Sequence, residues 1–260
     1  MLSQRRSVVS CPSHRFAKEI PVTERSPLLA RAAALLAVLA LAGVIGGPLL
    51  ARLGAVAPMT GFTVFLAGAL DALAALVIGV LGLLATRGGR PGRGNAWIGV
   101  AVGLAVVGVV LTSGSPGRGL PRINDITTNP DDAPSFEAAA QAEANRGRDM
   151  SYSADFAAQQ RSAYSDLGSI ALGLPPDEAF ERCREAAQAL GWEIVAADPA
   201  RGHLEARETS GLFLFVDDIV VRVRPAPDGA TVDVRSKSRD GQGDLGINAA
   251  RIRIFAAKIR

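Results

Sequence analysis

The stretch AAALLAVLALAGVIGGPLLA, residues 32–51, decides the fold of the first half of the chain, because it carries no charged or strongly polar side chain. Two more runs of the same kind follow at residues 61–85 and 96–113. Each run is long enough to cross about 30 Å of hydrocarbon as a helix that rises about 1.5 Å per residue. Three such runs within 82 residues have nothing polar to cover them, so the sequence predicts three transmembrane helices rather than the buried core of a soluble protein.

The 260-residue chain carries a formal charge of +3, which is divided unevenly along its length. Residues 1–118 hold 11 Lys and Arg against 3 Asp and Glu, a formal +8, and residues 119–260 hold 17 against 22, a formal −5. Proteins that bind nucleic acid concentrate Lys and Arg on the folded domain. Here the basic half is the membrane half, so we expect the lipid bilayer, and no nucleic acid, as a partner.

Positive charge also predicts the orientation of the spans, because short cytoplasmic loops carry an excess of Lys and Arg. Residues 1–31 form a basic tail, and Arg87, Arg90 and Arg93 follow the second span, whereas the loop after the first span carries only Arg52. The first span is longer than the apolar part of a signal peptide and is expected to remain uncut. The sequence therefore predicts a multi-pass protein of the inner (plasma) membrane with a cytoplasmic N-terminus and a C-terminal domain outside, in the periplasm.

One acidic residue, Asp71, lies in the middle of the second span, where an unpaired carboxylate is costly. It is a candidate polar site within the membrane, and a protonated carboxyl that bonds a neighbouring helix is the simpler explanation. Transport through the spans normally needs several such groups. The motifs Gly43-x-x-x-Gly47 and Gly99-x-x-x-Gly103 predict close contact between helices.

A linker rich in Gly and Pro, residues 114–122, separates the spans from a small α+β domain at residues 123–260. Residues 123–170 are expected to form a largely irregular strap with a short helix near 135–145. The elements predicted after this strap are a helix that starts at Pro175 and ends at Gly191, strands at 192–196, 202–208, 212–224 and 231–238, and a helix at 244–259.

Two of these strands alternate between apolar and polar residues, as half-buried antiparallel strands do. In IVVRVRP, Val221 and Val223 alternate with Arg222 and Arg224, and the turn sequence PDG at 227–229 predicts a hairpin with the next strand. The predicted fold is a membrane protein with three transmembrane helices followed by an α-β-β-β-β-α domain. Two helices cover one face of its antiparallel sheet, and the other face is expected to contact water.

Polar residues of this hairpin and of the last helix form the candidate ligand-binding set. Arg235, Lys237 and Arg239 share one strand face because they are spaced two residues apart. Basic groups beside a glycine-rich helix start suit an anion such as phosphate or carboxylate. An internal network of ion pairs is the alternative. The complete set is Asp217, Asp218, Arg222, Arg224, Arg235, Lys237, Arg239, Asp244, Asn248 and Arg251.

Motifs for catalysis, for a cofactor or for a metal ion are not found, so no catalytic residue, cofactor or metal ligand is predicted. The two histidines, His14 and His203, are expected on opposite sides of the bilayer, with His203 exposed on a strand. Cys11 and Cys183 are separated in the same way and cannot pair within one chain, and Cys183 is expected to be a small buried apolar residue.

Five stretches, read together, resemble the domain of unknown function 1499 family over roughly residues 123–260. They are INDITTNPDDAPSF, GWEIV, HLEARE, VDDIVVRVRP and VDVRSKSRDGQGDLGINAARIR. The resemblance implies a small module of the bacterial cell envelope that is sometimes fused to membrane spans. It implies no reaction.

Two classes of function therefore remain for an uncharacterised envelope protein of this kind. The leading hypothesis is a membrane-anchored periplasmic binding module for an anionic envelope ligand, a lipid headgroup or a partner protein. The alternative is a membrane-tethered hydrolase or transferase that uses Asp217 or Asp218 with Asp244, with or without a metal ion.

Overall fold

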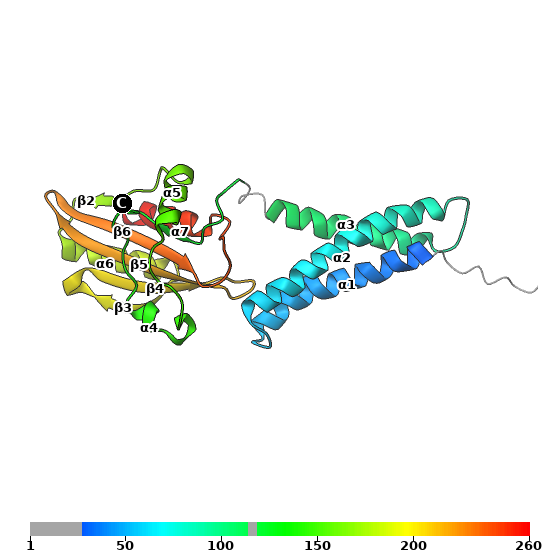
Figure 1. The fold of residues 1–260 in the computed structure, drawn as a ribbon, viewed down its shortest axis with the longest axis horizontal. Helices are drawn as coiled ribbons and strands as arrows, with labels where there is room; N and C mark the ends of the chain where they lie inside the picture. Colours follow the sequence, from blue (N-terminus) through cyan, green and yellow to red (C-terminus); the bar gives the residue numbers. More distant parts are fainter. Residues whose placement is uncertain (1–27, 114–118) are drawn as a thin grey trace, which may run out of the picture.

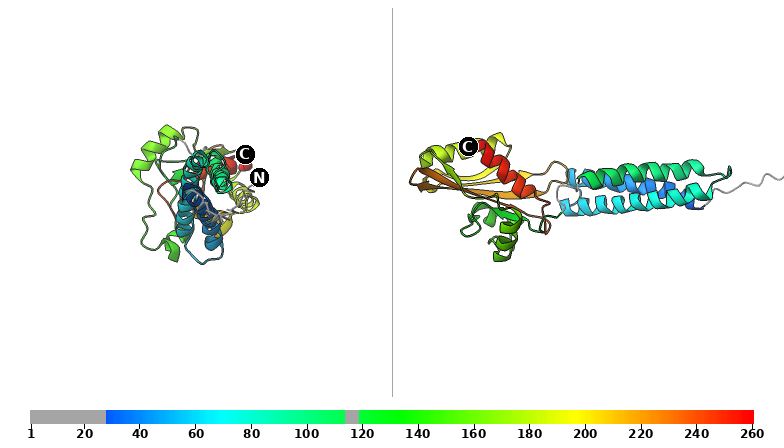
Figure 2. Two further views of the ribbon diagram at one scale, coloured as in Figure 1. Left: turned by 90° about the vertical axis from the view of Figure 1, so that its right-hand side faces the viewer. Right: turned by 90° about the horizontal axis from the view of Figure 1, so that it is seen from above.

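A computed structural model describes residues 28–113 and 119–260, which form a bundle of three long helices and an α+β domain (Figure 1). Residues 1–27 of the basic tail, which include Cys11 and His14, and most of the linker lie outside the described residues. The bundle and the domain lie end to end along the long axis of the molecule (Figures 1 and 2).

The bundle consists of α1 (Leu28–Arg52), α2 (Pro58–Ala85) and α3 (Arg93–Ser113), each long and apolar enough to cross a membrane. Its large apolar side chains point mainly outward, whereas most of its buried residues are alanines and glycines. This distribution suits a bundle in lipid, where small residues allow helices to approach closely.

Both small-residue motifs lie at helix contacts, as predicted. A Cβ atom added to Gly43 would come within 2.7 Å of the Gly68 Cα, and one added to Gly103 within 2.6 Å of the Ala72 carbonyl oxygen. The first contact joins α1 to α2, and the second joins α3 to α2. Any larger residue at these glycines would push the helices apart.

The two ends of the bundle differ in what they face. The loop between α1 and α2 and the last turn of α3 face the α+β domain, whereas the loop between α2 and α3 lies at the opposite end (Figure 1). The arginines of that loop, Arg87 and Arg90, are thus separated from the domain by the length of the bundle.

The domain is built on a six-stranded antiparallel sheet in the order β1-β6-β5-β4-β3, with β2 also paired to β6. All four predicted strands are present, but the third begins at Val216 and not at residue 212, because residues 210–215 form a loop. The predicted hairpin closes where Ala226 pairs with Gly229. Two short strands were not predicted: β1 lies in the segment expected to be irregular, and β2 begins at the last residue of that segment. The strands are β1 (Asp125–Thr127), β2 (Ile170–Leu172), β3 (Glu193–Asp198), β4 (His203–Thr209), β5 (Val216–Ala226) and β6 (Gly229–Ser238).

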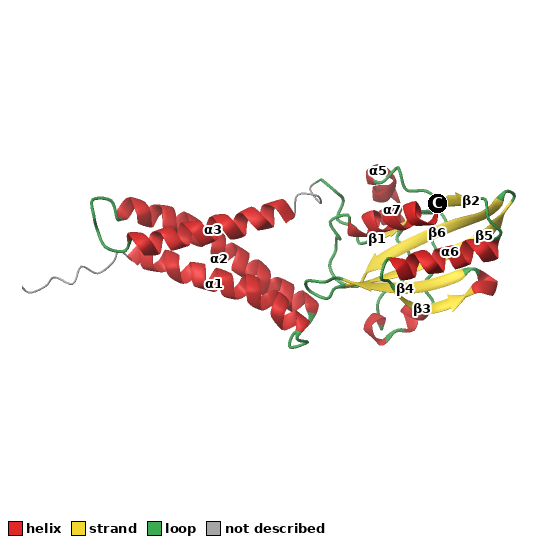
Figure 3. Ribbon diagram, turned by 180° about the vertical axis from the view of Figure 1, so that it is seen from behind, coloured by secondary structure: helices red, strands yellow, loops and turns green. Residues whose placement is uncertain are grey.

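The two predicted helices, α6 (Pro176–Ala189) and α7 (Ile247–Ile259), cover one face of the sheet (Figure 3). They bury Phe180 and Phe255 completely, and the Phe255 ring stacks on Trp192 with ring centroids 5.0 Å apart. The last helix begins three residues later than predicted, because residues 244–246 form the turn that precedes it.

The opposite face of the sheet is covered as well, so the prediction that it contacts water was wrong. Residues 128–164 of the predicted strap, to which the name strap is restricted from here on, cross this face on the side opposite α7 (Figure 2). The strap contains α4 (Ala138–Gln141), the short 3-10 helix η2 (Glu143–Asn145) and α5 (Ala154–Ala163). The alternation of valine and arginine correctly predicted that this face is polar. A polar face need not contact water, however, because charged side chains can be buried when they are paired.

Candidate functional site

The face of the sheet under the strap carries a row of alternating charge across five strands. Glu193 pairs with Arg207, Arg207 with Asp218, Asp218 with Lys237 and Lys237 with Asp125 in the strand register. Opposite charges on neighbouring strands attract, and this pattern stabilises the register. We call the charged and polar side chains of this face the polar layer.

Arg235 lies at the centre of the polar layer and is 1% exposed. Its Nε and Nη2 atoms donate to the two carboxylate oxygens of Asp125, at 2.8 and 2.7 Å. Its Nη1 and Nη2 atoms also donate to the carbonyl oxygens of Pro134 and Met150, at 3.1 and 2.9 Å. These hydrogen bonds hold the strap on the sheet. They also occupy the Arg235 N–H groups that would otherwise be available to bind an external anion.

Lys237 and Arg239 are also bound to buried carboxylates. The Lys237 ammonium lies 2.8 Å from the Asp125 carboxylate. Arg239 donates to both oxygens of Asp218 at 2.9 and 2.6 Å, and Asn145 of the strap donates to Asp218 at 2.8 Å. As predicted, the three basic residues of β6 and the loop after it lie on one side of the sheet.

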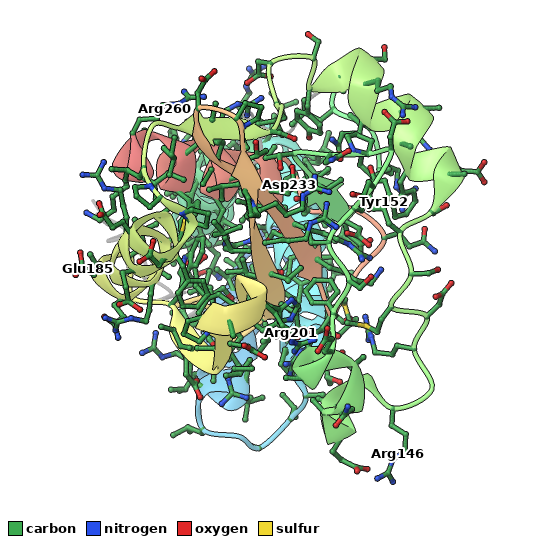
Figure 4. All side chains as sticks on the ribbon, turned by 90° about the vertical axis from the view of Figure 1, so that its left-hand side faces the viewer. Arg146, Tyr152, Glu185, Arg201, Asp233 and Arg260 are labelled. Carbon is green, nitrogen blue, oxygen red and sulfur yellow. The ribbon has the colours of Figure 1, made fainter. Side chains whose placement is uncertain are left out.

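Arg222 and Arg224 form the solvent edge of the polar layer. Their guanidinium groups meet two carboxylates, the fully buried Asp233 and the half-exposed Asp132 of the strap, at 2.7 to 2.9 Å. Hydrogen bonding and charge from Arg222 lower the pKa of Asp132 below its ordinary value. Figure 4 shows Asp233 between the strap and the helical face.

His203 and Glu205 form a buried pair that the sequence analysis did not assign to any site. His203 is only 9% exposed, which corrects the expectation of an exposed strand residue, and its Nε2 lies 2.8 Å from Glu205 Oε1. The Glu205 carboxylate also accepts the backbone N–H groups of residues 137, 138 and 139 at 2.7 to 2.8 Å. Burial opposes its ionisation, but the hydrogen bonds from His203 and from the backbone lower its pKa overall. The spacing His-x-Glu on a strand was the signal for this pair.

The helical face carries a second polar group of residues, which we call the Arg251 cluster. The Arg251 guanidinium donates to Asp217 at 2.6 Å and to Asn248 Oδ1 at 2.6 Å, and it also pairs with Glu208. Ser236 lies in the same cluster, 3.0 Å from Arg251. The sheet therefore separates Asp217, Asn248 and Arg251 from the predicted residues of the polar layer, which are Asp218, Arg222, Arg224, Arg235, Lys237 and Arg239.

Asp244 and Asp218 are separated in the same way. Asp244 lies just before α7, where its carboxylate accepts the backbone N–H groups of Gly246 and Asn248 at 2.9 and 2.7 Å. Within residues 28–113 and 119–260, no group of three or more His, Cys, Asp and Glu side chains is arranged to hold a metal ion. Of the carboxylates named in the hydrolase alternative, Asp218 is separated from Asp244 by the sheet, whereas Asp217 and Asp244 lie on the same face.

A pocket of about 320 Å³ opens beside the Arg251 cluster, between α7 and the end of β4. Its walls are mostly apolar, and Glu208, Ser210 and Arg251 form its polar end. Ile247 and Ile254 on its rim are 55% and 57% exposed. We call it the α7 pocket; it is lined by Leu190, Trp192, Glu208, Ser210, Ile247, Ala250, Arg251 and Ile254.

Two further predicted residues lie apart from these sites. Asp71 is half-buried in α2, and no hydrogen bond or ion pair joins it to another described residue. Cys183 is fully buried on the inner side of α6, as predicted, and burial raises its thiol pKa to about 12.

Comparison with family models gives one match, over residues 125–259, to the family described as Protein of unknown function (DUF1499). The match covers more than half of the chain and spans the sheet, the strap and both helices of the domain. Comparisons with curated proteins and with solved structures found no match.

Proposed function

The chain belongs to the DUF1499 family, with three apolar helices ahead of the family domain, and from this premise we propose that it is a membrane-anchored binding protein. Its ligand is an amphiphile, a molecule with an apolar chain and a polar headgroup, which binds in the α7 pocket. The observation that carries this proposal is the combination of apolar walls with a charged end in one open pocket.

The size and chemistry of the α7 pocket support this ligand class. Pockets for small molecules typically measure about 300–1,000 Å³ and combine apolar walls with a few polar groups. The exposed side chain of Ile254 would lose contact with water when an apolar chain covers it, which favours binding. At the charged end, the Glu208 side chain is 37% exposed and can orient a headgroup.

The other members of the predicted anion-binding set support a structural role. Arg235, Lys237 and Arg239 each bond to a buried carboxylate under the strap. Displacing those carboxylates by an external anion would leave buried charges without partners, which is strongly unfavourable. Of the predicted residues, Arg251 lines the α7 pocket.

Ligand binding can be tested with the emission of Trp192, which lines the α7 pocket. The chain has two tryptophans, so Trp97→Phe leaves Trp192 as the only one. We expect a brominated fatty acid to quench Trp192 saturably in the full chain in lipid nanodiscs. Ala250→Phe fills the pocket and should lower the affinity measured from this quenching about tenfold.

The matched control is Ala257→Phe, which lies two turns further along the same helix and is also exposed. It should leave the affinity unchanged. Quenching that does not saturate, or that Ala250→Phe and Ala257→Phe change equally, would show that the ligand is not in the α7 pocket.

The proposal also places the domain outside the cytoplasm, in the periplasm of a bacterium with two membranes. Support comes from the arginines of the α2–α3 loop, which lie at the bundle end far from the domain. Alkaline phosphatase fused after Arg260 should be active, and the same enzyme fused after Gly89 should be inactive. The reverse pattern would place the domain in the cytoplasm.

A further inference from the structure

The end of the domain nearest the bundle carries an aromatic contact with it. The loop between β4 and β5 has the sequence SGLFLF, residues 210–215. Phe213 is 7% exposed and meets Phe62 and Phe65 of α2 edge-on, with ring centroids 5.3 and 5.5 Å apart. This contact fixes the loop against the first turns of α2.

A hydrogen bond adds a second attachment at the same place. Arg52, the last residue of α1, donates from Nη1 to the carbonyl oxygen of Gly211 at 2.5 Å. Phe215 also meets the Phe62 ring, at 5.8 Å. The loop therefore lies at the level where α1 ends and α2 begins, which is the level of a membrane surface if the bundle spans the bilayer.

Several apolar side chains around this attachment have no cover. Leu212 in the loop is 53% exposed, and Leu53, which follows α1, is 70% exposed. Leu245 and Ile247, at the start of α7, are 61% and 55% exposed. The start of α7 and the loop before it face the bundle, as the SGLFLF loop does (Figure 1).

Backbone strain marks the same two loops. Among the described residues, Leu214 and Leu245 are the two non-glycine residues with positive φ, at 61° and 55°. Leucine rarely adopts this conformation, and such strain persists where the surroundings or a function require it. In both cases, it occurs in a loop that faces the bundle.

We infer that Leu212, Leu245 and Ile247 form an apolar rim that lies in the headgroup region of the bilayer leaflet on the domain side. The occupant of this surface is lipid, because the rim is continuous with the contact between the SGLFLF loop and the ends of α1 and α2. The domain is then held at three points: by its linker, by the aromatic contact and by the rim. This inference goes beyond the proposed binding of a ligand and does not depend on it.

The test uses single cysteines at Leu212 and Leu245 in the full chain with Cys11→Ser, labelled with a polarity-sensitive fluorophore in phosphatidylcholine nanodiscs. Cys183 stays in place because it is fully buried. We expect a blue-shifted emission at both positions, with several-fold stronger quenching by a lipid that carries a nitroxide near its headgroup than by aqueous iodide.

The control is Asp228→Cys in the exposed turn between β5 and β6, at the end of the hairpin opposite residues 216 and 238. Its label should respond to iodide and not to the nitroxide lipid. Iodide quenching at Leu212 and Leu245 as strong as at Asp228 would overturn the inference. Protection from both quenchers would overturn it too, because protein and not lipid would then cover the rim.

Discussion

Asp125 and Arg235 lie 110 residues apart and are joined by two hydrogen bonds of 2.8 and 2.7 Å, although neither side chain is more than 2% exposed. The pair connects β1, the first strand of the domain, to β6, the last one. Lys237 also contacts the Asp125 carboxylate, so one buried anion serves two cations. Removing Asp125 and removing Arg235 should therefore change the stability of the domain by different amounts.

Asp125→Asn should destabilise the domain more than Arg235→Met. The first change leaves two cations without their carboxylate and should cost about 3–5 kcal/mol, the usual effect of breaking a buried ion pair. The second change leaves Asp125 paired with Lys237. Urea unfolding of the full chain in detergent micelles, followed by Trp192 emission with Trp97→Phe, measures both. Arg253→Met, which removes an exposed pair with Asp166, is the control and should cost about 1 kcal/mol or less. Equal losses for Asp125→Asn and Arg235→Met would contradict the prediction.

Glu205 should make the domain sensitive to acid. Its pKa in the folded protein lies below the ordinary value of 4.5, so its contribution to stability is fully present above about pH 4.5 and is lost as the pH falls through the lowered pKa. Glu205→Gln removes this dependence, so the stability difference between wild type and variant should shrink as the pH falls. Unfolding curves at several pH values below 5 measure it, with Asp228→Asn as an exposed control. A constant difference across this range would show that Glu205 does not contribute in this way.

Gly47→Val and Gly46→Val should have different effects on the bundle. A side chain at Gly47 would collide with the backbone of Gly61 and Phe65 in α2, whereas nothing lies within 4 Å of a Cβ added at Gly46. We expect Gly47→Val to lower the midpoint of thermal unfolding in micelles by several degrees and Gly46→Val to change it little. Circular dichroism measures both variants. Similar midpoints would mean that α1 and α2 do not pack through this motif.

Cys183 should resist thiol reagents in the folded protein. Its side chain is fully buried, and its thiol pKa is raised to about 12, so almost no thiolate is present at pH 8. With Cys11→Ser, a maleimide should label the chain only after denaturation, as mass spectrometry can show. Rapid labelling without denaturant would indicate that α6 opens away from the sheet.

Much of the fold could be predicted because its signals are local. Val221 and Val223 alternate with Arg222 and Arg224, and this period of two fixes both the strand and the two faces of the sheet. The three membrane helices follow from length and composition, which need no knowledge of distant contacts. The close helix contacts at Gly43 and Gly103 followed from spacing alone.

The cover over the polar layer could not be predicted, because it depends on pairs of residues far apart in the sequence. Gln160 of the strap bonds the backbone of Thr127, and Asn145 bonds Asp218, but neither residue belongs to a periodic pattern. The residues of the predicted site were grouped because they are close together in the sequence, which does not show to which face of the sheet each side chain points. Asp217 and Asp218 are neighbours in sequence but point to opposite faces, and this divides the predicted set.

The position of β1 at the edge of the sheet beside β6 has a consequence for how the domain is assembled. During synthesis, residues 125–127 emerge long before residues 229–238. Asp125 and the strap therefore have no sheet to bind until the hairpin of β5 and β6 has been synthesised and has folded. Long-range pairing of this kind slows folding. We expect the newly synthesised segment to be vulnerable to proteases, or to need a chaperone, until the last strand closes the structure.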